Sequence, residues 1–167
     1  MKTSILMLSK SFPAKHPRAG ESTFFEHKLK NQLEGNINDP LGCKKHTIRG
    51  NFNGGNFKKW KTRIEKILQG EFALSIREWE DKPYNSQQRI IFHLDHSTPL
   101  GYQRISMRYD QETKSIRCVI DGRPFTDINL LAANDGLSFA DFSAWFFAKG
   151  KAGLFQGVII HFTDMRY

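Results

Sequence analysis

Several features that quickly classify a protein are missing from this sequence of 167 residues. No apolar run approaches the roughly 18 residues that a membrane-spanning helix needs, so we expect no contact with a membrane. The first apolar run breaks at Ser9-Lys10 with no cleavage site of small residues after it, so we also expect no secretory signal peptide. Internal repeats and low-complexity linkers are absent too, which favours one domain over residues 1–167.

Cysteine and metal-binding patterns are also scarce. The two cysteines, Cys43 and Cys118, form no C-x-x-C pair, and the six histidines show no H-x-x-x-H spacing. This favours free thiols in a reducing, cytoplasmic environment over a disulfide framework. A zinc site has no support either, so we expect neither a metal nor another cofactor.

Acidic residues are few relative to basic ones. The chain has 17 Asp and Glu against 25 Lys and Arg, which gives a net charge of +8 and an isoelectric point of about 9.6. A basic excess of this size favours polyanionic partners, of which nucleic acid is the commonest. Composition alone leaves open the alternative of a soluble protein that is basic without such a partner.

Apolar periodicity and turn residues predict about six strands and three helices. Helices are expected over residues 22–34, 56–69 and 138–149. In the first, Ser22 or Thr23 is the expected N-cap, and Glu26 completes a capping box. Strands are expected over residues 3–8, 72–79, 89–94, 102–109, 116–120 and 154–162, and residues 44–49 would alternate in the same way if extended. Because strands outnumber helices and several are joined by tight turns, we expect an α+β fold, a small barrel with helices at its rim.

The stretch GCKKHTIRGNF concentrates basic and hydroxyl side chains. Gly42, Lys44, Thr47 and Arg49 follow the spacing G-x-K-x-x-T-x-R. In a regular strand Lys44 and Thr47 face opposite sides, so they can meet only if the chain kinks, near Gly42 or at the start of the strand. An ordinary solvated strand is the alternative reading.

This spacing, after a helix and at the start of a strand, resembles the signature of the ASCH domain. That domain belongs to the PUA-like superfamily, so the resemblance implies a small β-barrel with flanking helices. Four segments, FPAKHPRAGESTFF, KHTIRGNF, LSIREWEDKPYNSQQ and NDGLSFADFSAWF, extend the similarity over roughly the whole chain. They are most similar to uncharacterised ASCH-like proteins of Bacteroidetes and their mobile elements.

A more distant resemblance connects the chain to the small bacterial acetylcytidine amidohydrolase of the same superfamily. The similar parts are a Thr-Phe-Phe segment at Thr23 and an acidic residue before the last helix and strand, here Asp135. That enzyme has Glu where this chain has Asp135, and this chain is longer after the motif. The resemblance therefore implies a related pocket and does not transfer the substrate.

One hypothesis for the site is a small amidohydrolase. The resemblance implies the trio of Lys44, Thr47 and Asp135 as catalytic residues. A lysine buried beside Arg49 has a depressed pKa, so it can take a proton from Thr47, which then attacks an amide carbon. The alternative is structural, with Thr47 a plain strand residue and Asp135 a turn residue.

A second hypothesis is a module that binds RNA or a modified nucleotide. The face of residues 72–79 that carries Arg77 and Trp79 fits neither a core nor a plain surface, and the following polar loop offers Tyr84 for base stacking. A third reading, an adaptor that binds a protein partner, stays open, and the oligomeric state is not indicated. The residues expected to contact a nucleotide are Lys44, Arg49, Arg77, Trp79, Lys82, Tyr84 and Gln87.

Overall fold

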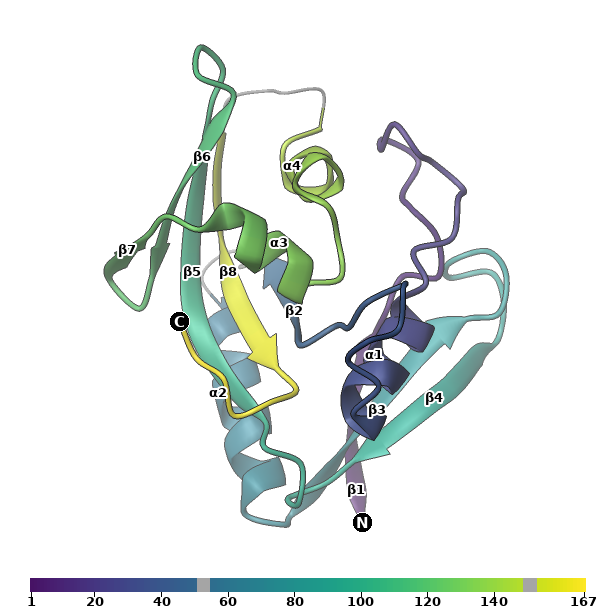
Figure 1. Cartoon of the computed structure of the whole chain (residues 1–167). Helices are drawn as coiled ribbons and strands as arrows, with labels where there is room; N and C mark the ends of the chain where they lie inside the picture. The colour runs from purple at the N-terminus through teal and green to yellow at the C-terminus, as the bar shows by residue number, and fades with distance from the viewer. Residues whose placement is uncertain (51–54, 149–152) are drawn as a thin grey trace.

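Alternating apolar residues form eight strands in the described part of the chain, residues 1–50, 55–148 and 153–167 of the computed structural model. The strands pair in two sheets joined by helices (Figure 1). The three-stranded sheet has the order β1 (Lys2–Met7), β3 (Phe72–Trp79) and β4 (Gln88–Leu94). The five-stranded sheet has the order β2 (His46–Gly50), β8 (Gly153–His161), β5 (Gly101–Asp110), β6 (Ser115–Ile120) and β7 (Arg123–Phe125).

The pairing gives each sheet a distinct character. In the smaller sheet β1 runs parallel to β3, which places β1 at an edge. In the larger sheet every pair is antiparallel, and β5 and β6 form the hairpin that the sequence predicts. Within β2, Thr47 lies opposite Ile160 and Arg49 opposite Val158, so the motif residues are supported by the buried strand β8.

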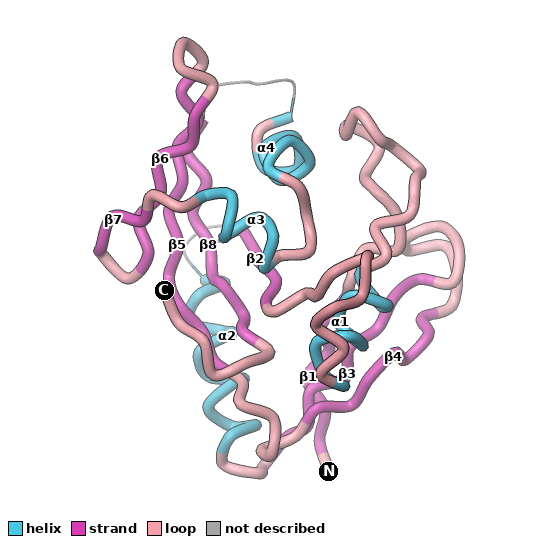
Figure 2. The backbone as a smooth tube through the Cα atoms, in the orientation of Figure 1, coloured by secondary structure: helices cyan, strands magenta, loops and turns pink. Residues whose placement is uncertain are grey.

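In the described part of the chain, four helices pack on and between the sheets: α1 (Phe25–Glu34), α2 (Gly55–Leu68), α3 (Ile128–Asn134) and α4 (Phe139–Phe146). The buried face of α2 carries Trp60, Ile64 and Ile67, and this helix contacts β3 as well as β5 and β8. α1 lies over the smaller sheet, whereas α3 and α4 lie beside the larger one (Figures 1 and 2). None of the helices in the described ranges is long and apolar enough to cross a membrane.

The α+β class expected from the sequence is confirmed, with some differences in detail. Each expected strand has a counterpart in the structure, and β7 is an additional strand. It lies at an edge of its sheet, so Pro124, which lacks an N–H group, interrupts no hydrogen bonds between central strands. Ser138 caps α4 as expected, since its hydroxyl accepts from the Asp141 amide at 3.1 Å. The expected end of that helix at residue 149 lies outside the described residues.

The expected start of the first helix is wrong. α1 begins at Phe25, and its N-cap residue, Phe24, has a φ of 56° and makes no side-chain cap. The Thr23 hydroxyl accepts from the Phe25 amide at 3.3 Å and donates to the Ser9 carbonyl at 2.6 Å, which ties the start of the helix to the segment after β1. Glu26 does not complete a capping box, because its carboxylate pairs with Arg89 on β4.

Candidate functional site

The segment before β2 holds Lys44 away from the regular strand. Gly42 has a φ of 78°, a backbone conformation that suits glycine, and β2 begins only at His46. The Lys44 amide donates to the Lys28 carbonyl on α1 at 3.0 Å, and Asn31 of the same helix donates to the Gly42 carbonyl at 2.9 Å. The chain therefore kinks where the sequence predicts it, with α1 fixing the kink.

Lys44 forms a fully buried ion pair with Asp135, 91 residues further along the chain. Its ammonium group donates to the Asp135 carboxylate at 2.6 Å and to the Asp135 carbonyl at 2.5 Å. The same nitrogen lies 3.8 Å from the centroid of the Phe25 ring, a cation–π contact. Lys28 donates to the Gly136 carbonyl at 2.7 Å, which ties the turn that carries Asp135 to α1.

Burial shifts both partners toward their neutral forms. It lowers the pKa of Lys44 to about 8, with Asp135 opposing the shift and the positive charges of Arg49 and Lys28 adding to it. Burial likewise raises the pKa of Asp135, against the effect of Lys44 and Arg49. Lys44 is therefore closer to losing its proton near neutral pH than a solvated lysine.

Thr47 and Arg49 share one face of β2 and line an inner cavity together with Lys44 and Asp135. Aromatic side chains of α1 and α4, including Phe25, close this cavity. The space open to a water-sized sphere is about 10 Å³, close to what one water molecule requires. Within the described residues the Thr47 hydroxyl has no hydrogen-bond partner, and Lys44 makes no hydrogen bond to it.

Arg49 connects this inner cavity to a wider outer cleft. The outer cleft measures about 550 Å³ and lies between residues 7–14 and the loop after β3. Arg49 lines both spaces and donates to the carbonyl of Met7, at the end of β1. Its side chain thus spans from the five-stranded sheet to the three-stranded one.

Three aromatic side chains line the outer cleft, the buried Phe12 and the rings of Trp79 and Tyr84. Trp79 ends β3, and Tyr84 in the following loop lies with its ring centroid 5.5 Å away, tilted by 49°. Tyr84 is 88% exposed, which is unusual for an aromatic side chain. The same wall carries one acidic residue, Asp81. The rings offer a surface on which a planar group can stack.

Three of the expected ligand residues line neither space. Arg77 donates to Ser75 at 2.9 Å and to Gln88 at 3.3 Å, so the smaller sheet itself engages its guanidinium. Lys82 and Gln87 are exposed in the loop that also carries Tyr84. The structure therefore brings together Lys44, Thr47, Arg49 and Asp135, places Trp79 and Tyr84 at the adjoining cleft, and leaves Arg77, Lys82 and Gln87 outside both.

Comparison of the chain with protein-family models, curated proteins and solved structures found no match. In the described ranges, no group of three or more His, Cys, Asp or Glu side chains is arranged to hold a metal ion. The geometry of the inner cavity and the outer cleft is therefore the basis for inferring a function.

Sequence reasoning missed a buried histidine behind the ion pair. His46 Nδ1 lies 3.8 Å from the Asp135 carboxylate. Its Nε2 lies 2.7 Å from the Tyr167 hydroxyl, which accepts from Asn134 at 2.9 Å. Nδ1 has no hydrogen-bond partner among the described residues, so the direction of the bond between Nε2 and Tyr167 sets which ring nitrogen carries the proton. Burial lowers the pKa of His46, which keeps the ring neutral. The sequence contains one signal for this position: Lys44 and His46 are two residues apart, so they share a face if the segment is extended.

Proposed function

We propose that the protein is an RNA- or nucleotide-binding module of the PUA-like, ASCH type, with its ligand held in the outer cleft and reaching toward the inner cavity. The observation that supports this most is Arg49, a cation that lines both spaces. On one side of it lie the half-buried Trp79 ring and the exposed Tyr84 ring, and on the other the buried ion pair. A nucleotide needs a stacking surface, a phosphate contact and polar groups at one end, and this arrangement offers all three.

The charge around the inner cavity favours an anionic or strongly polar ligand. Lys44, Arg49 and Lys28 lie near a single buried carboxylate, that of Asp135. Because positive charge exceeds negative charge there, a phosphate group or a base edge rich in acceptors restores the balance. Free thiols at Cys43 and Cys118 fit the reducing, cytoplasmic location that we also propose.

Binding of uridine monophosphate and of a labelled uridine oligonucleotide of about 12 nucleotides tests this proposal. Tyr84→Ala and Arg49→Gln should each weaken binding of both probes by about tenfold, since stacking and a phosphate contact are each worth roughly 1–3 kcal/mol. Ile37→Ala and Arg117→Gln are matched controls at exposed positions away from the cleft and should bind normally. Equal affinity of all four variants would contradict the proposal.

A second candidate function, a metal-independent amidohydrolase, is favoured by the lowered pKa of Lys44 and the unpaired Thr47 hydroxyl in one cavity. The neutral Lys44 amine takes the Thr47 proton as the oxygen attacks an amide carbon, and Arg49 stabilises the oxyanion. The proton then passes to the leaving amine, and water hydrolyses the resulting ester. For this, Lys44 has to turn from Asp135 toward Thr47.

Turnover of an acylated nucleoside such as acetylcytidine tests this second candidate. The rate should rise with pH toward about 8 as Lys44 loses its proton. Thr47→Ala should abolish turnover and Thr47→Ser should retain part of it. Absence of turnover with the native protein, at concentrations where the nucleoside binds, would leave the binding function alone.

A further inference from the structure

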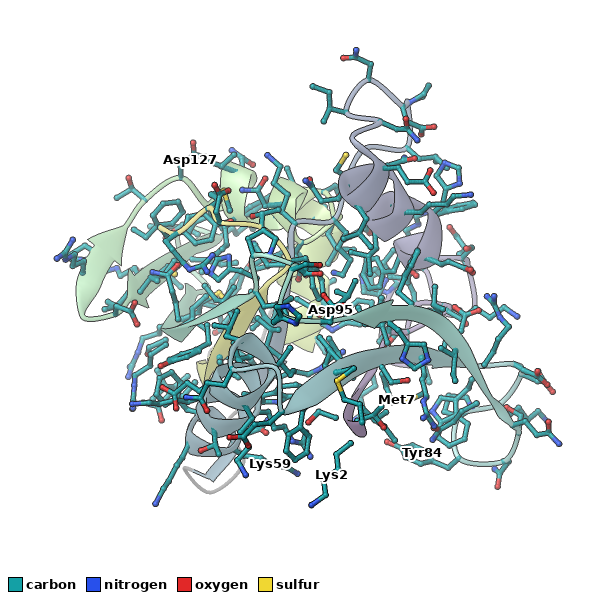
Figure 3. All side chains as sticks on the ribbon, turned by 90° about the horizontal axis from the view of Figure 1, so that it is seen from below. Lys2, Met7, Lys59, Tyr84, Asp95 and Asp127 are labelled. Carbon is teal, nitrogen blue, oxygen red and sulfur yellow. The ribbon has the colours of Figure 1, made fainter. Side chains whose placement is uncertain are left out.

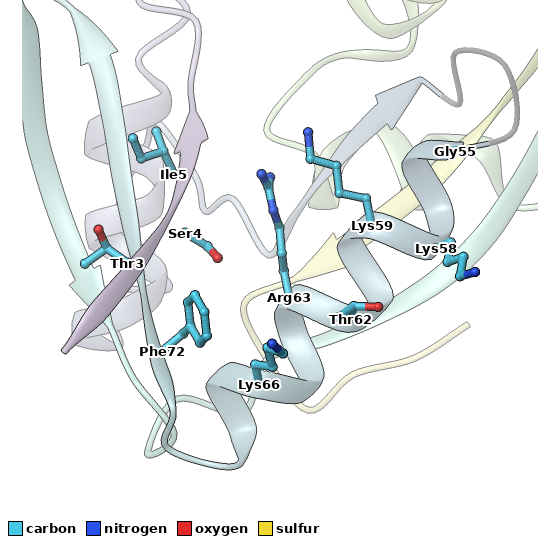
Figure 4. Close-up of a pocket in the computed structure, with 10 residues that line it drawn as sticks. All are labelled: Thr3, Ser4, Ile5, Gly55, Lys58, Lys59, Thr62, Arg63, Lys66 and Phe72. Carbon is cyan, nitrogen blue, oxygen red and sulfur yellow. The ribbon is translucent and has the colours of Figure 1, made fainter.

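A second large groove lies outside the site described above, between α2 and the edge strand β1 (Figure 4). It measures about 660 Å³. One wall consists of α2 side chains and the other of residues Thr3, Ser4 and Ile5, with Phe72 at one end. We call this space the α2–β1 groove.

Four cations line the α2 wall: Lys58, Lys59, Arg63 and Lys66. None of them forms an ion pair within the described residues, and the groove has no acidic lining residue. The opposite side of the same helix is different, since Lys61 there lies 3.9 Å from Glu65. The cations of the groove are therefore not neutralised by the protein itself.

Two of these cations are oriented by aromatic rings. The Arg63 guanidinium lies 4.9 Å from the centroid of Trp60, and the Lys66 ammonium lies 5.2 Å from that of Phe72. In Figure 4, Lys59 and Arg63 extend from α2 into the space that faces β1. The rings thus limit the mobility of Arg63 and Lys66, whereas Lys58 and Lys59 are exposed to solvent.

The β1 wall offers unpaired hydrogen-bond donors. The Leu8 amide donates to β3, so by alternation the backbone groups of Thr3, Ile5 and Met7 point away from that strand. The Met7 carbonyl accepts from Arg49, in agreement with this direction. Ser4 is only 6% exposed, its hydroxyl has no partner among the described residues, and it points into the groove (Figure 4).

We propose that the α2–β1 groove binds the phosphate backbone of a single-stranded nucleic acid. Lysine, arginine, serine hydroxyls and backbone amides are the groups that contact phosphates in such complexes. Four cations without a counter-charge favour a polyanion over a neutral peptide added to the edge of β1. An acidic peptide is the competing occupant, and the experiment below includes it.

The groove and the outer cleft adjoin along β1. Ile5 lines the groove and Met7 lines the cleft, so along the strand the two spaces are separated by about 7 Å. Lys59, Met7 and Tyr84 lie on the same side of the molecule (Figure 3). A single-stranded nucleic acid with one base in the outer cleft can therefore continue into the groove. This continuation rests on the proposed function, whereas the phosphate site in the groove does not.

The test compares two double variants with equal loss of charge. Lys59→Gln with Arg63→Gln removes two groove cations, and Lys30→Gln with Lys61→Gln removes two cations that pair with glutamates elsewhere. With a labelled uridine oligonucleotide of about 12 nucleotides, the groove variant should bind about tenfold more weakly. Its slope of log affinity against log salt should be smaller by about 1.4, or 0.7 for each lost contact. The control variant should keep the native slope.

Two results would overturn the proposal. One is an equal loss in both double variants, which would show that only overall charge matters. The other is that the groove variant weakens binding of a poly-glutamate peptide of equal charge and does not weaken binding of the oligonucleotide. If melting shows that the groove variant is destabilised, the exposed Lys59→Gln change alone is compared with Lys61→Gln.

Failure of this proposal and failure of the cleft proposal give different patterns. Binding of uridine monophosphate should be unaffected by the groove variant and weakened by Tyr84→Ala. If Tyr84→Ala has no effect on either probe while the groove variant loses oligonucleotide binding, the groove stands without the cleft. The reverse pattern removes the groove and leaves the cleft.

Discussion

The inner cavity and the α2–β1 groove use positive charge in opposite ways. In the cavity, Lys44 is fully buried, paired with Asp135, and has room for about one water beside it. In the groove, Lys58 and Lys59 are exposed, Arg63 and Lys66 are half-buried, and all four are unpaired within the described residues. A buried, paired cation selects a ligand by geometry because mismatched groups there cost much, whereas exposed cations attract any polyanion and respond to salt.

The largest expected effect concerns the buried pair. Asp135→Ala removes the only carboxylate that pairs with the buried Lys44 ammonium among the described residues and leaves its bond to the backbone carbonyl of residue 135. The free energy of unfolding should therefore fall by about 3–5 kcal/mol. Adding Lys44→Met should recover much of this loss, because it removes the uncompensated buried charge. Urea unfolding measures both. If Asp135→Ala lowers the free energy of unfolding by less than about 1 kcal/mol, the buried pair contributes no more to stability than an exposed cation of the groove.

The pH dependence of stability should differ between the two regions. The pKa of Lys44 is about 8 in the folded protein and 10.5 in the absence of burial. Between these values the unfolded chain binds more protons, so this group makes stability rise with pH from about 8 to 10.5. The gain is at most about 3 kcal/mol relative to Lys44→Met, which lacks the titration. Unfolding series of both proteins across this range show the difference, and parallel curves would contradict it.

A smaller effect is expected at the turn that carries Asp135. Gly136 has a φ of 80°, and a Cβ there would lie 3.2 Å from the Lys28 side chain. Gly136→Ala should therefore cost about 1–2 kcal/mol and weaken ligand binding by displacing Asp135. Gly153→Ala is the matched control, since a Cβ there meets nothing within 4 Å. Thermal unfolding compares the two, and equal midpoints would show that the turn tolerates a side chain.

The smallest expected effect on stability belongs to the groove. Lys59→Gln changes an exposed side chain without an ion pair in the described residues, so the free energy of unfolding should change by no more than about 0.5 kcal/mol. Urea unfolding at two salt concentrations measures it. A loss above about 2 kcal/mol would mean that Lys59 is a structural residue. The cations of the groove and of the cavity would then not differ in their contribution to stability.

Local patterns in the sequence predict much of the fold. The alternation in residues 72–79 corresponds to β3, and the glycine at position 35 ends α1 with a φ of 75°. The start of α1 could not be predicted, because it depends on the left-handed backbone of Phe24 and on a bond from the Thr23 hydroxyl to the distant Ser9 carbonyl. Such a choice depends on tertiary contacts that a local pattern does not contain.

The candidate site is predictable only in part for the same reason. The spacing of Lys44 and Thr47 marks the motif, and Asp135 entered through a family resemblance, since nothing local connects residues 91 positions apart. Arg77 shares an alternating face with Trp79, yet Ser75 and Gln88 engage its guanidinium. His46 was overlooked because its partner, Tyr167, lies 121 positions away.

The bond from Arg49 to the Met7 carbonyl has a consequence for how fast a ligand binds. This guanidinium fastens β2 of one sheet to β1 of the other. If the phosphate of the proposed ligand takes the N–H group that Arg49 gives to Met7, ligand binding requires release of this bond. The rate of association should then level off at high ligand concentration instead of rising without limit.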